Sequence, residues 1–167
     1  MTSGGEEITY LIASYNQRDY VGDCIASLKA QTCDQWSAII YDDASSDDSA
    51  RLIGNLIDER FRFVEASENG GYIAALRNMI AAADTDIVAI VDADDAIDPQ
   101  ATRCILDAFA KVPDAVFAYS RFEMCDSSLS KTLGEFGRVV PVGGTAIVDG
   151  PVGHIKSFRK SAYAKTS

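Results

Sequence analysis

The sequence lacks an excess of basic residues, and this excludes one broad class of partner. Of its 167 residues, 15 are Lys or Arg and 25 are Asp or Glu, so the formal net charge is −10. Proteins that bind the nucleic-acid backbone present a basic face that neutralises phosphates. A chain this acidic has to recruit cations locally in order to handle phosphate, which favours a bound metal over an arginine-rich cradle.

Long apolar runs and paired cysteines are also missing. No apolar run approaches the roughly 20 residues that a membrane helix needs, and there is no secretory signal. The chain has no Cys-X-X-Cys pair, so we do not expect a zinc site; its cysteines are Cys24, Cys33, Cys104 and Cys125. We expect a cytoplasmic protein with buried, reduced thiols. A membrane anchor outside this chain would place it at the inner face of the membrane.

The composition is that of a globular protein. Hydrophobic residues make up 47% and charged residues 24% of the sequence, and this length suits one domain with a sizeable core. There is no internal repeat, low-complexity tract or linker. We therefore predict a single domain over residues 1–167.

Hydrophobic periodicity predicts strands that alternate with helices. Strands are expected at 8–13, 36–41, 61–65, 87–91 and 115–122, with helices from 19 to about 31, through 52–57, over 73–83 and from 99 through 109. Residues 87–91 show no polar alternation, as in a central strand that is buried on both faces. Beyond Met124 the regularity weakens, and a last helix is expected near Ser157. The fold class is therefore α/β, with a mostly parallel sheet flanked by helices on both faces and an irregular C-terminal part.

Polar side chains follow three of the predicted strands. In open parallel sheets, ligands bind at the carboxyl ends of the strands. All of these side chains are therefore expected on one rim: Ser14, Tyr15 and Asn16 after the first strand, Asp42 and Asp43 after the second, and Asp92, Asp94 and Asp95 after the fourth.

The acidic run Asp92-Ala93-Asp94-Asp95 predicts a divalent metal site. Two carboxylates separated by one residue in an extended turn suit Mg2+ or Mn2+, which take one or two carboxylates together with phosphate oxygens and water. A metal held there would stabilise the charge that builds on a leaving diphosphate. The alternative is that Asp94 or Asp95 caps the helix that begins near Pro99.

The other strand ends carry candidates for nucleotide recognition. Asp42 either contacts substrate or caps a helix, and Asp43 is placed to accept a hydrogen bond from a base N–H such as that of uracil. The ring of Tyr15 would pack against the same base. Arg77 either meets a phosphate at this rim or is an ordinary exposed helix residue.

Several strings in this order and spacing resemble the nucleotide-binding half of a family 2 glycosyltransferase with the Rossmann-like GT-A fold. The resemblance covers Ile8 to about Pro99 well and the remainder loosely. The strings that carry it are Ile12-Ala13-Ser14-Tyr15-Asn16, Gln31-Thr32, Tyr41-Asp42-Asp43-Ala44-Ser45-Ser46-Asp47, Asn69-Gly70-Gly71, Leu76-Arg77-Asn78 and Val91-Asp92-Ala93-Asp94-Asp95.

The resemblance implies a donor site for a nucleoside diphosphate sugar, often UDP-linked. Tyr15 and Asp43 would hold the base, Asp92 would face the ribose and the metal, and Asp94 would ligate Mg2+ or Mn2+. The substrate-binding set expected on this basis is Ser14, Tyr15, Asn16, Asp42, Asp43, Arg77, Asp92 and Ala93. Residues 8–99 would form the nucleotide-sugar-binding core, and 100–167 the start of the acceptor-side region.

The reaction that the resemblance implies is transfer of the sugar to an acceptor hydroxyl, on a saccharide or another molecule, with inversion at the anomeric centre. Its general base lies in an acidic motif downstream of a segment that Gly153–Arg159 resembles, so we expect it after Ser167, unless Asp149 or His154 takes that role. The alternative function is a nucleotide-sugar-binding module without transferase activity of its own. A haloacid-type phosphatase is disfavoured because its Asp-X-Asp would follow the first strand. A receiver domain is disfavoured because it needs a lysine after the fifth strand.

Overall fold

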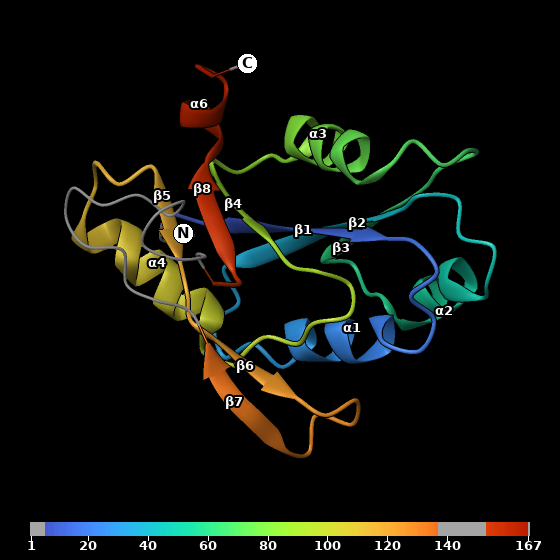
Figure 1. Ribbon diagram of the computed structural model, residues 1–167. Coiled ribbons are helices and arrows are strands. Elements are labelled where there is room, and N and C mark those ends of the chain that lie inside the picture. The colour runs from blue at the N-terminus through green and yellow to red at the C-terminus, as the bar shows by residue number, and fades with distance from the viewer. Residues whose placement is uncertain (1–5, 137–152, 167) are drawn as a thin grey trace.

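The computed structural model describes residues 6–136 and 153–166, and its framework is a six-stranded sheet with helices on both faces (Figure 1). The first part of the chain alternates strand and helix: β1 (Ile8–Ser14), α1 (Val21–Lys29), β2 (Trp36–Asp42), α2 (Ser49–Leu56), β3 (Phe61–Glu65), α3 (Tyr72–Ala82), β4 (Ile87–Ile90) and α4 (Ala101–Lys111). The later part holds β5 (Phe117–Tyr119), β6 (Phe122–Cys125), β7 (Thr132–Phe136), β8 (Lys156–Arg159) and the short helix α6 (Lys160–Tyr163).

The strand order in the sheet is β3-β2-β1-β4-β8-β5. The four strands from β1 to β4 pair in parallel, with Ile8 opposite both Trp36 and Ile87. β8 enters from far along the chain and runs antiparallel to both β4 and β5. β6 and β7 form a separate antiparallel hairpin. The predicted α/β class and mostly parallel sheet are confirmed.

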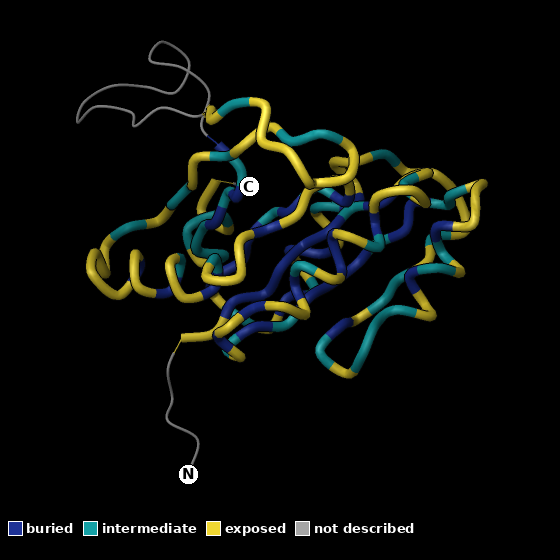
Figure 2. Tube along the Cα trace, turned by 90° about the horizontal axis from the view of Figure 1, so that it is seen from below, coloured by how far each residue is buried: buried dark blue, intermediate teal, exposed yellow. Residues whose placement is uncertain are grey.

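The two faces of the sheet have separate cores because successive strand residues point to opposite sides. Tyr10 and Ile12 pack toward α1, α2 and α4, in a cluster that includes Phe109. Leu11 packs on the other side against α3. Every residue of β1 except Ala13 is buried, and the dark strands at the centre of Figure 2 show the same burial. Such double burial explains why these strands read as continuous apolar runs.

Two expectations for the later part of the chain are wrong. The strand expected at 115–122 is split, because β5 ends at Tyr119 and the chain leaves the sheet before β6 begins. The helix expected near Ser157 is instead strand β8, and only four helical residues follow it. Ser157 is 1% exposed, and its hydroxyl donates to the carbonyl of Ala118 at 3.0 Å. The conformation of this segment is determined by its pairing with strands that are distant in the sequence, and local periodicity does not indicate such pairing.

The four cysteines are free thiols. Cys24 and Cys33 are buried as expected, whereas Cys104 is exposed on α4. Within residues 6–136 and 153–166, no helix is both long enough and apolar enough to cross a membrane.

Candidate donor and metal site

The carboxyl ends of β1, β2 and β4 meet at one rim, as parallel pairing requires. Ser14 lies opposite Asp42 in the register of β1 and β2, and Leu11 lies opposite Ile90 in that of β1 and β4. The three polar sets predicted after these strands are therefore neighbours. Tyr15 is 49% exposed at this rim, so its side chain is accessible to a ligand.

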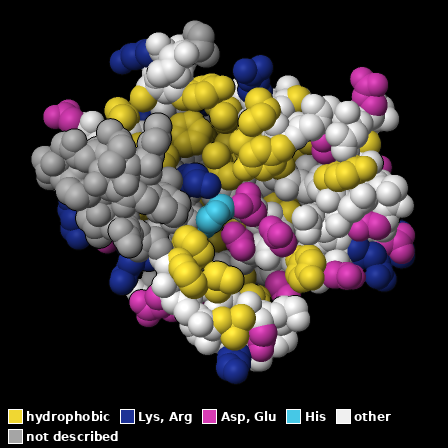
Figure 3. Space-filling view, in the orientation of Figure 1, with side chains coloured by type: hydrophobic (Ala, Val, Ile, Leu, Met, Phe, Trp, Pro, Cys, Tyr) yellow, Lys and Arg dark blue, Asp and Glu magenta, His cyan; other side chains and the backbone are white. Residues whose placement is uncertain are grey.

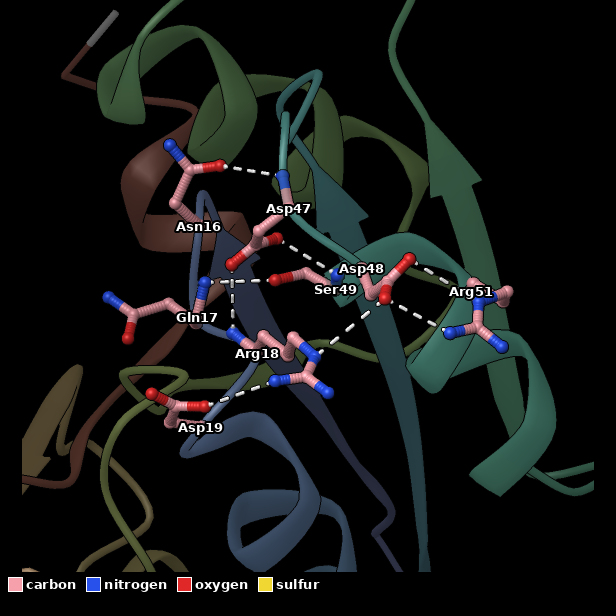
Figure 4. A network of polar contacts seen from close by, with 8 residues as sticks. All are labelled: Asn16, Gln17, Arg18, Asp19, Asp47, Asp48, Ser49 and Arg51. Atoms are coloured by element: carbon pink, nitrogen blue, oxygen red, sulfur yellow. Dashed lines mark hydrogen bonds and ion pairs between the residues drawn. The ribbon is translucent and has the colours of Figure 1, made fainter.

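The loops after β1 and β2 are tied together by side chains that the sequence assigned to substrate. Asn16 takes a left-handed conformation with φ 55°, which asparagine tolerates better than most residues. Its amide oxygen accepts the backbone N–H of Ser46 at 2.8 Å, and its own N–H donates to the Ser45 hydroxyl at 2.9 Å. Figure 4 shows that the contacts continue through Gln17 and Arg18 to the start of α2. Asn16 therefore holds the two loops together at the rim.

Asp42 is buried and has a clear local partner. One carboxylate oxygen accepts the backbone N–H of Ser45 at 2.9 Å, and the other accepts the Ser45 hydroxyl at 2.6 Å. The structure thus gives Asp42 a turn-forming role, close to the capping alternative. Ser14 differs, because its buried hydroxyl has no hydrogen-bond partner among the described residues.

Asp43 fixes the turn that precedes α3. Its two carboxylate oxygens accept the backbone N–H groups of Gly70 and Gly71 at 2.9 and 2.8 Å. Gly71 has φ 84°, a left-handed conformation that glycine adopts without steric penalty. Asp43 therefore has a structural role that the sequence did not indicate. Its proposed contact with a base stays a prediction.

Arg77 is exposed on α3, on the side away from the helix's buried residues Ala75, Met79 and Ile80. The contacts of the described residues do not link it to the acidic loop. Its proposed phosphate contact also stays a prediction.

The acidic loop leaves β4 in a tight turn that the N–H of Asp95 closes by donating to the carbonyl of Asp92 at 3.0 Å. Ala93 is buried, Asp92 is half-buried, and Asp94 is exposed. Burial raises the pKa of Asp95, and the neighbouring charges of Asp92 and Asp94 raise it further, against the opposing effect of His154. The turn therefore gathers carboxylates that repel one another.

His154 completes a cluster at this turn. Its Nδ1 lies 3.3 Å from a carboxylate oxygen of Asp92 and 3.7 Å from one of Asp95. Ligand atoms of the three residues all lie within 4.8 Å of one another, and Figure 3 shows the histidine beside acidic side chains near the centre of this face. Nδ1 is buried, and although Asp92 is near, the alignment does not make a hydrogen bond. An unpartnered imidazole nitrogen beside two carboxylates fits a metal ion.

His154 reaches the cluster because the chain before β8 packs closely against Ser120. A Cβ built on Gly153 would lie 1.9 Å from the carbonyl oxygen of Ser120, so only glycine fits there. Ser120 also bonds to Ile155 through both its N–H and its hydroxyl. The other candidate base, Asp149, lies outside the described residues.

Tyr72, at the start of α3, is a second residue that sequence reasoning missed. Its hydroxyl lies 3.5 Å from the second carboxylate oxygen of Asp92. Burial and the Asp92 charge raise the pKa of this hydroxyl, so it remains a donor. No sequence pattern pointed to Tyr72, whereas His154 was identifiable as the only histidine of the chain.

Comparison with known proteins assigns the family. The model described as "Glycosyl transferase family 2" matches residues 9–165. This chain belongs to glycosyl transferase family 2. It is 35% identical to the poly-beta-1,6-N-acetyl-D-glucosamine synthase of Staphylococcus aureus (strain MSSA476) over 109 residues, which are 65% of this chain and 26% of that protein. It is 29% identical to the teichoic acid poly(glycerol phosphate) polymerase of Staphylococcus epidermidis over 106 residues, which are 62% of this chain and 15% of that protein.

Solved structures share the fold of this chain. The family 2 chain superimposes on S. aureus TarS 1–349 in complex with UDP with a TM-score of 0.75 and 16% identity, over 96% of this chain and 48% of that one. The mannosyltransferase PcManGT of Pyrobaculum calidifontis, in complex with GDP-Man and Mn2+, superimposes with a TM-score of 0.63 and 17% identity. The match covers 99% of this chain and 48% of that one. The predicted GT-A fold is confirmed. The chain spans about a quarter or less of the curated relatives and about half of these solved chains.

Proposed function

We propose that this chain is the donor-binding portion of an inverting glycosyltransferase that holds a nucleoside diphosphate sugar, UDP-linked, through a divalent metal. The observation that carries the proposal is the cluster of Asp92, Asp95 and His154 at the carboxyl end of β4. Residues 8–99 would bind the nucleotide sugar, and the later residues would begin the acceptor side. Solved relatives bound to UDP, to UDP-GlcNAc and to GDP-Man with Mn2+ support this assignment.

We assign different parts of the donor to different residues at the rim. Tyr15 would supply an exposed ring for the base, and Asp43 would accept a hydrogen bond from the base with its carboxylate already oriented by Gly70 and Gly71. Asp92 and His154 would hold the metal, together with either Asp94, which the family resemblance favours, or Asp95, which the geometry favours. A mixed set of imidazole nitrogen and carboxylate oxygen suits Mn2+ better than Mg2+, which binds almost entirely through oxygen.

The metal, when bound, would neutralise the charge that develops on the leaving diphosphate. The acceptor hydroxyl oxygen forms its bond to the anomeric carbon as the bond from that carbon to the diphosphate oxygen breaks, and the hydroxyl proton passes to a general base. The Nδ1 of His154 faces the carboxylates of Asp92 and Asp95, where the metal would take it as a ligand. We therefore assign His154 to the metal, and we propose that the base lies beyond the described residues.

The first prediction concerns the metal. Asp92→Asn and His154→Asn should each weaken Mn2+-dependent UDP binding by more than about 100-fold, since even residues that only hydrogen-bond to a metal ligand are worth about 10–100-fold in affinity. Calorimetry with Mn2+ and UDP measures the loss. Asp107→Ala, which removes an exposed carboxylate on α4, is the matched control and should bind as the wild type does.

Comparing Asp94→Ala with Asp95→Ala decides the remaining ligand, because only the variant that removes it should abolish binding. If Mn2+-dependent UDP binding is undiminished in both variants and in His154→Asn, the proposed metal site is wrong. A donor-hydrolysis and transfer assay then separates the two functions. Binding without turnover that is restored when downstream sequence is added supports the glycosyltransferase, and binding that never yields turnover in the longer protein supports a binding module.

A further inference from the structure

Gln31 and Thr32 belong to the strings that resemble the family, yet they lie at the far end of α1 from the metal cluster and do not touch it. Gln31 is 6% exposed. The proposed donor site gives the pair no role. Their contacts show where they act.

α1 and the turn that follows it carry side chains that bond to the backbone of the acidic loop and the segment after it, residues 92–99. Cys24 and Ser27 are spaced by three residues, so they lie on the same side of α1, and Gln31 follows just after the helix ends at Lys29. The Cys24 thiol donates to the carbonyl of Asp92 at 3.6 Å. Ser27 and Gln31 bond further along, and Figure 1 shows the chain that leaves β4 running beside α1 before it enters α4. We call these three side chains the anchoring face.

The hydrogen bonds of the anchoring face follow the loop in order. The backbone N–H of Ile97 donates to the Ser27 hydroxyl at 3.1 Å, and that hydroxyl donates to the carbonyl of Cys24 at 2.8 Å. The amide group of Gln31 donates to the carbonyl of Asp98 at 2.8 Å. Just beyond the face, the N–H of Thr32 donates to the carbonyl of Pro99 at 2.9 Å. The loop is thus held from its first residue to its last.

Gln31 is itself fixed on both sides of its amide. Its oxygen accepts the N–H and the hydroxyl of Thr102, each at 2.9 Å, and its nitrogen also donates to the carbonyl of Ser27 at 3.2 Å. The Thr102 N–H belongs to the first turn of α4, where backbone donors have no partner within their own helix. Gln31 therefore caps α4 from the turn after α1 while it holds the acidic loop.

The acidic loop needs such support because residues 92–100 contain no helix or strand. Within the loop, Asp92, Asp94 and Asp95 follow one another closely, and repulsion between their like charges favours a more open arrangement. A metal ion binds more tightly when its ligands are already held together, since less conformational entropy is lost on binding. The anchoring face provides external bonds that oppose the opening.

We propose that Ser27 and Gln31 are positioning residues of the donor site, which hold the loop so that Asp92 and Asp95 meet His154. The proposal rests on the proposed function for its effect on metal binding. Its structural part, the anchoring of the loop, is independent of any ligand.

The test uses Ser27→Ala and Gln31→Ala, each measured twice. Hydrogen exchange without metal should show the amides of Asp95 and Ile97 exchanging at least about tenfold faster, because their turn is no longer held. Calorimetry of the folded variants should show Mn2+ affinity lower by about 10–100-fold, the range for residues that orient metal ligands without touching the metal. Gln31→Glu, which keeps the oxygen that accepts from Thr102 but loses the donor to Asp98, should behave like Gln31→Ala.

Tyr10→Phe is the matched control. It deletes the hydroxyl that lies 2.9 Å from the Thr102 side chain, so it damages the same buried network without touching the loop. Its stability should fall while its Mn2+ affinity and loop exchange stay at the wild-type level. Unchanged loop exchange in both Ser27→Ala and Gln31→Ala would overturn the proposal, and so would an equal loss of Mn2+ affinity in Tyr10→Phe.

The two proposals fail in different ways. If the wild type binds no Mn2+, the proposed function is wrong, and the exchange data still decide whether the anchoring face holds the loop. If Gln31→Ala does not fold, Ser27→Ala and Gln31→Glu carry the same comparison.

Discussion

Asp43 has a role in the fold that the structure shows and a role in ligand binding that we propose. Both of its oxygens accept backbone N–H groups from the turn before α3, and each oxygen retains a further lone pair. The turn holds the carboxylate in one orientation, which is what recognition of a base requires. Its structural role and its proposed role are therefore compatible.

Asp43→Ala should accordingly produce two effects. The free energy of unfolding should fall by about 1.5–3 kcal/mol, the usual value of hydrogen bonds to a charged group, and urea titration measures it. Affinity for UDP should fall more than affinity for free Mn2+. Equal losses for uridine, guanosine and adenosine diphosphates would remove the base-recognition role. Asp43→Asn, which keeps one acceptor oxygen, should lose less stability than Asp43→Ala.

The sequence indicated most residues of the rim but not how they pair. Their positions at predicted strand ends correctly placed four residues at the rim, because parallel strands bring their carboxyl ends together. These residues are Ser14, Asp42, Asp43 and Asp92. The sequence did not locate His154, which arrives through β8 from the other end of the chain. A contact between residues so far apart in sequence leaves no periodic signal in a single sequence.

At the scale of elements, β8 and α6 are attached to the sheet by charged side chains. The Arg159 guanidinium lies 2.8 Å from a carboxylate oxygen of Glu6 and 3.1 Å from one of Asp86. Burial alone would raise the pKa of Asp86, but hydrogen bonds from Ser161 and Arg159 outweigh burial and hold it below the usual range. The ionised form of Asp86 therefore stabilises the attachment.

This attachment should weaken in acid. A lowered pKa in the folded state means that the stabilisation is complete above about pH 4, where unfolded aspartate ionises, and is lost as the pH falls through the folded value. At neutral pH, Asp86→Asn should reduce the free energy of unfolding by about 1 kcal/mol or less, as expected for a partly exposed pair.

Urea unfolding of Asp86→Asn and the wild type across this pH range measures the difference, which should shrink toward zero in acid. Asp114→Asn, which changes an exposed residue after α4, should match the wild type throughout. A difference for Asp86→Asn that stays constant down to strong acid would contradict the assignment.

The elements that local pattern predicted well are those that bury a continuous apolar face. The strands β1 to β4 were predictable from apolar runs, and the helices between them were predictable from the 3.6-residue spacing of their apolar residues. β8 did not, since its only apolar residue is Phe158 and its pairing partners lie on β4 and β5. Its strand character depends on the sheet that it joins.

At the scale of the whole molecule, the net charge of −10 shapes metal binding. A negative potential attracts divalent cations, and dissolved salt screens it. Raising the ionic strength from about 0.01 M to about 1 M shortens the Debye length from about 30 Å to about 3 Å. Mn2+ binding without nucleotide should therefore weaken several-fold over this range. A titration that follows the electron paramagnetic resonance signal of free Mn2+ measures this affinity at each salt concentration. An affinity that does not depend on salt would show that only the immediate ligands determine Mn2+ binding.

The position of β8 has a consequence for how the protein is made. β8 lies between β4 and β5 in the sheet. Until the ribosome has synthesised residues 156–159, one edge of β4 is therefore unpaired and β5 has no neighbouring strand in this sheet. Exposed edges invite association with other chains, and such long-range pairing is slow. His154 becomes available at the same moment. The proposed metal site could thus form only when the sheet closes, so metal loading would wait until the ribosome has delivered this strand.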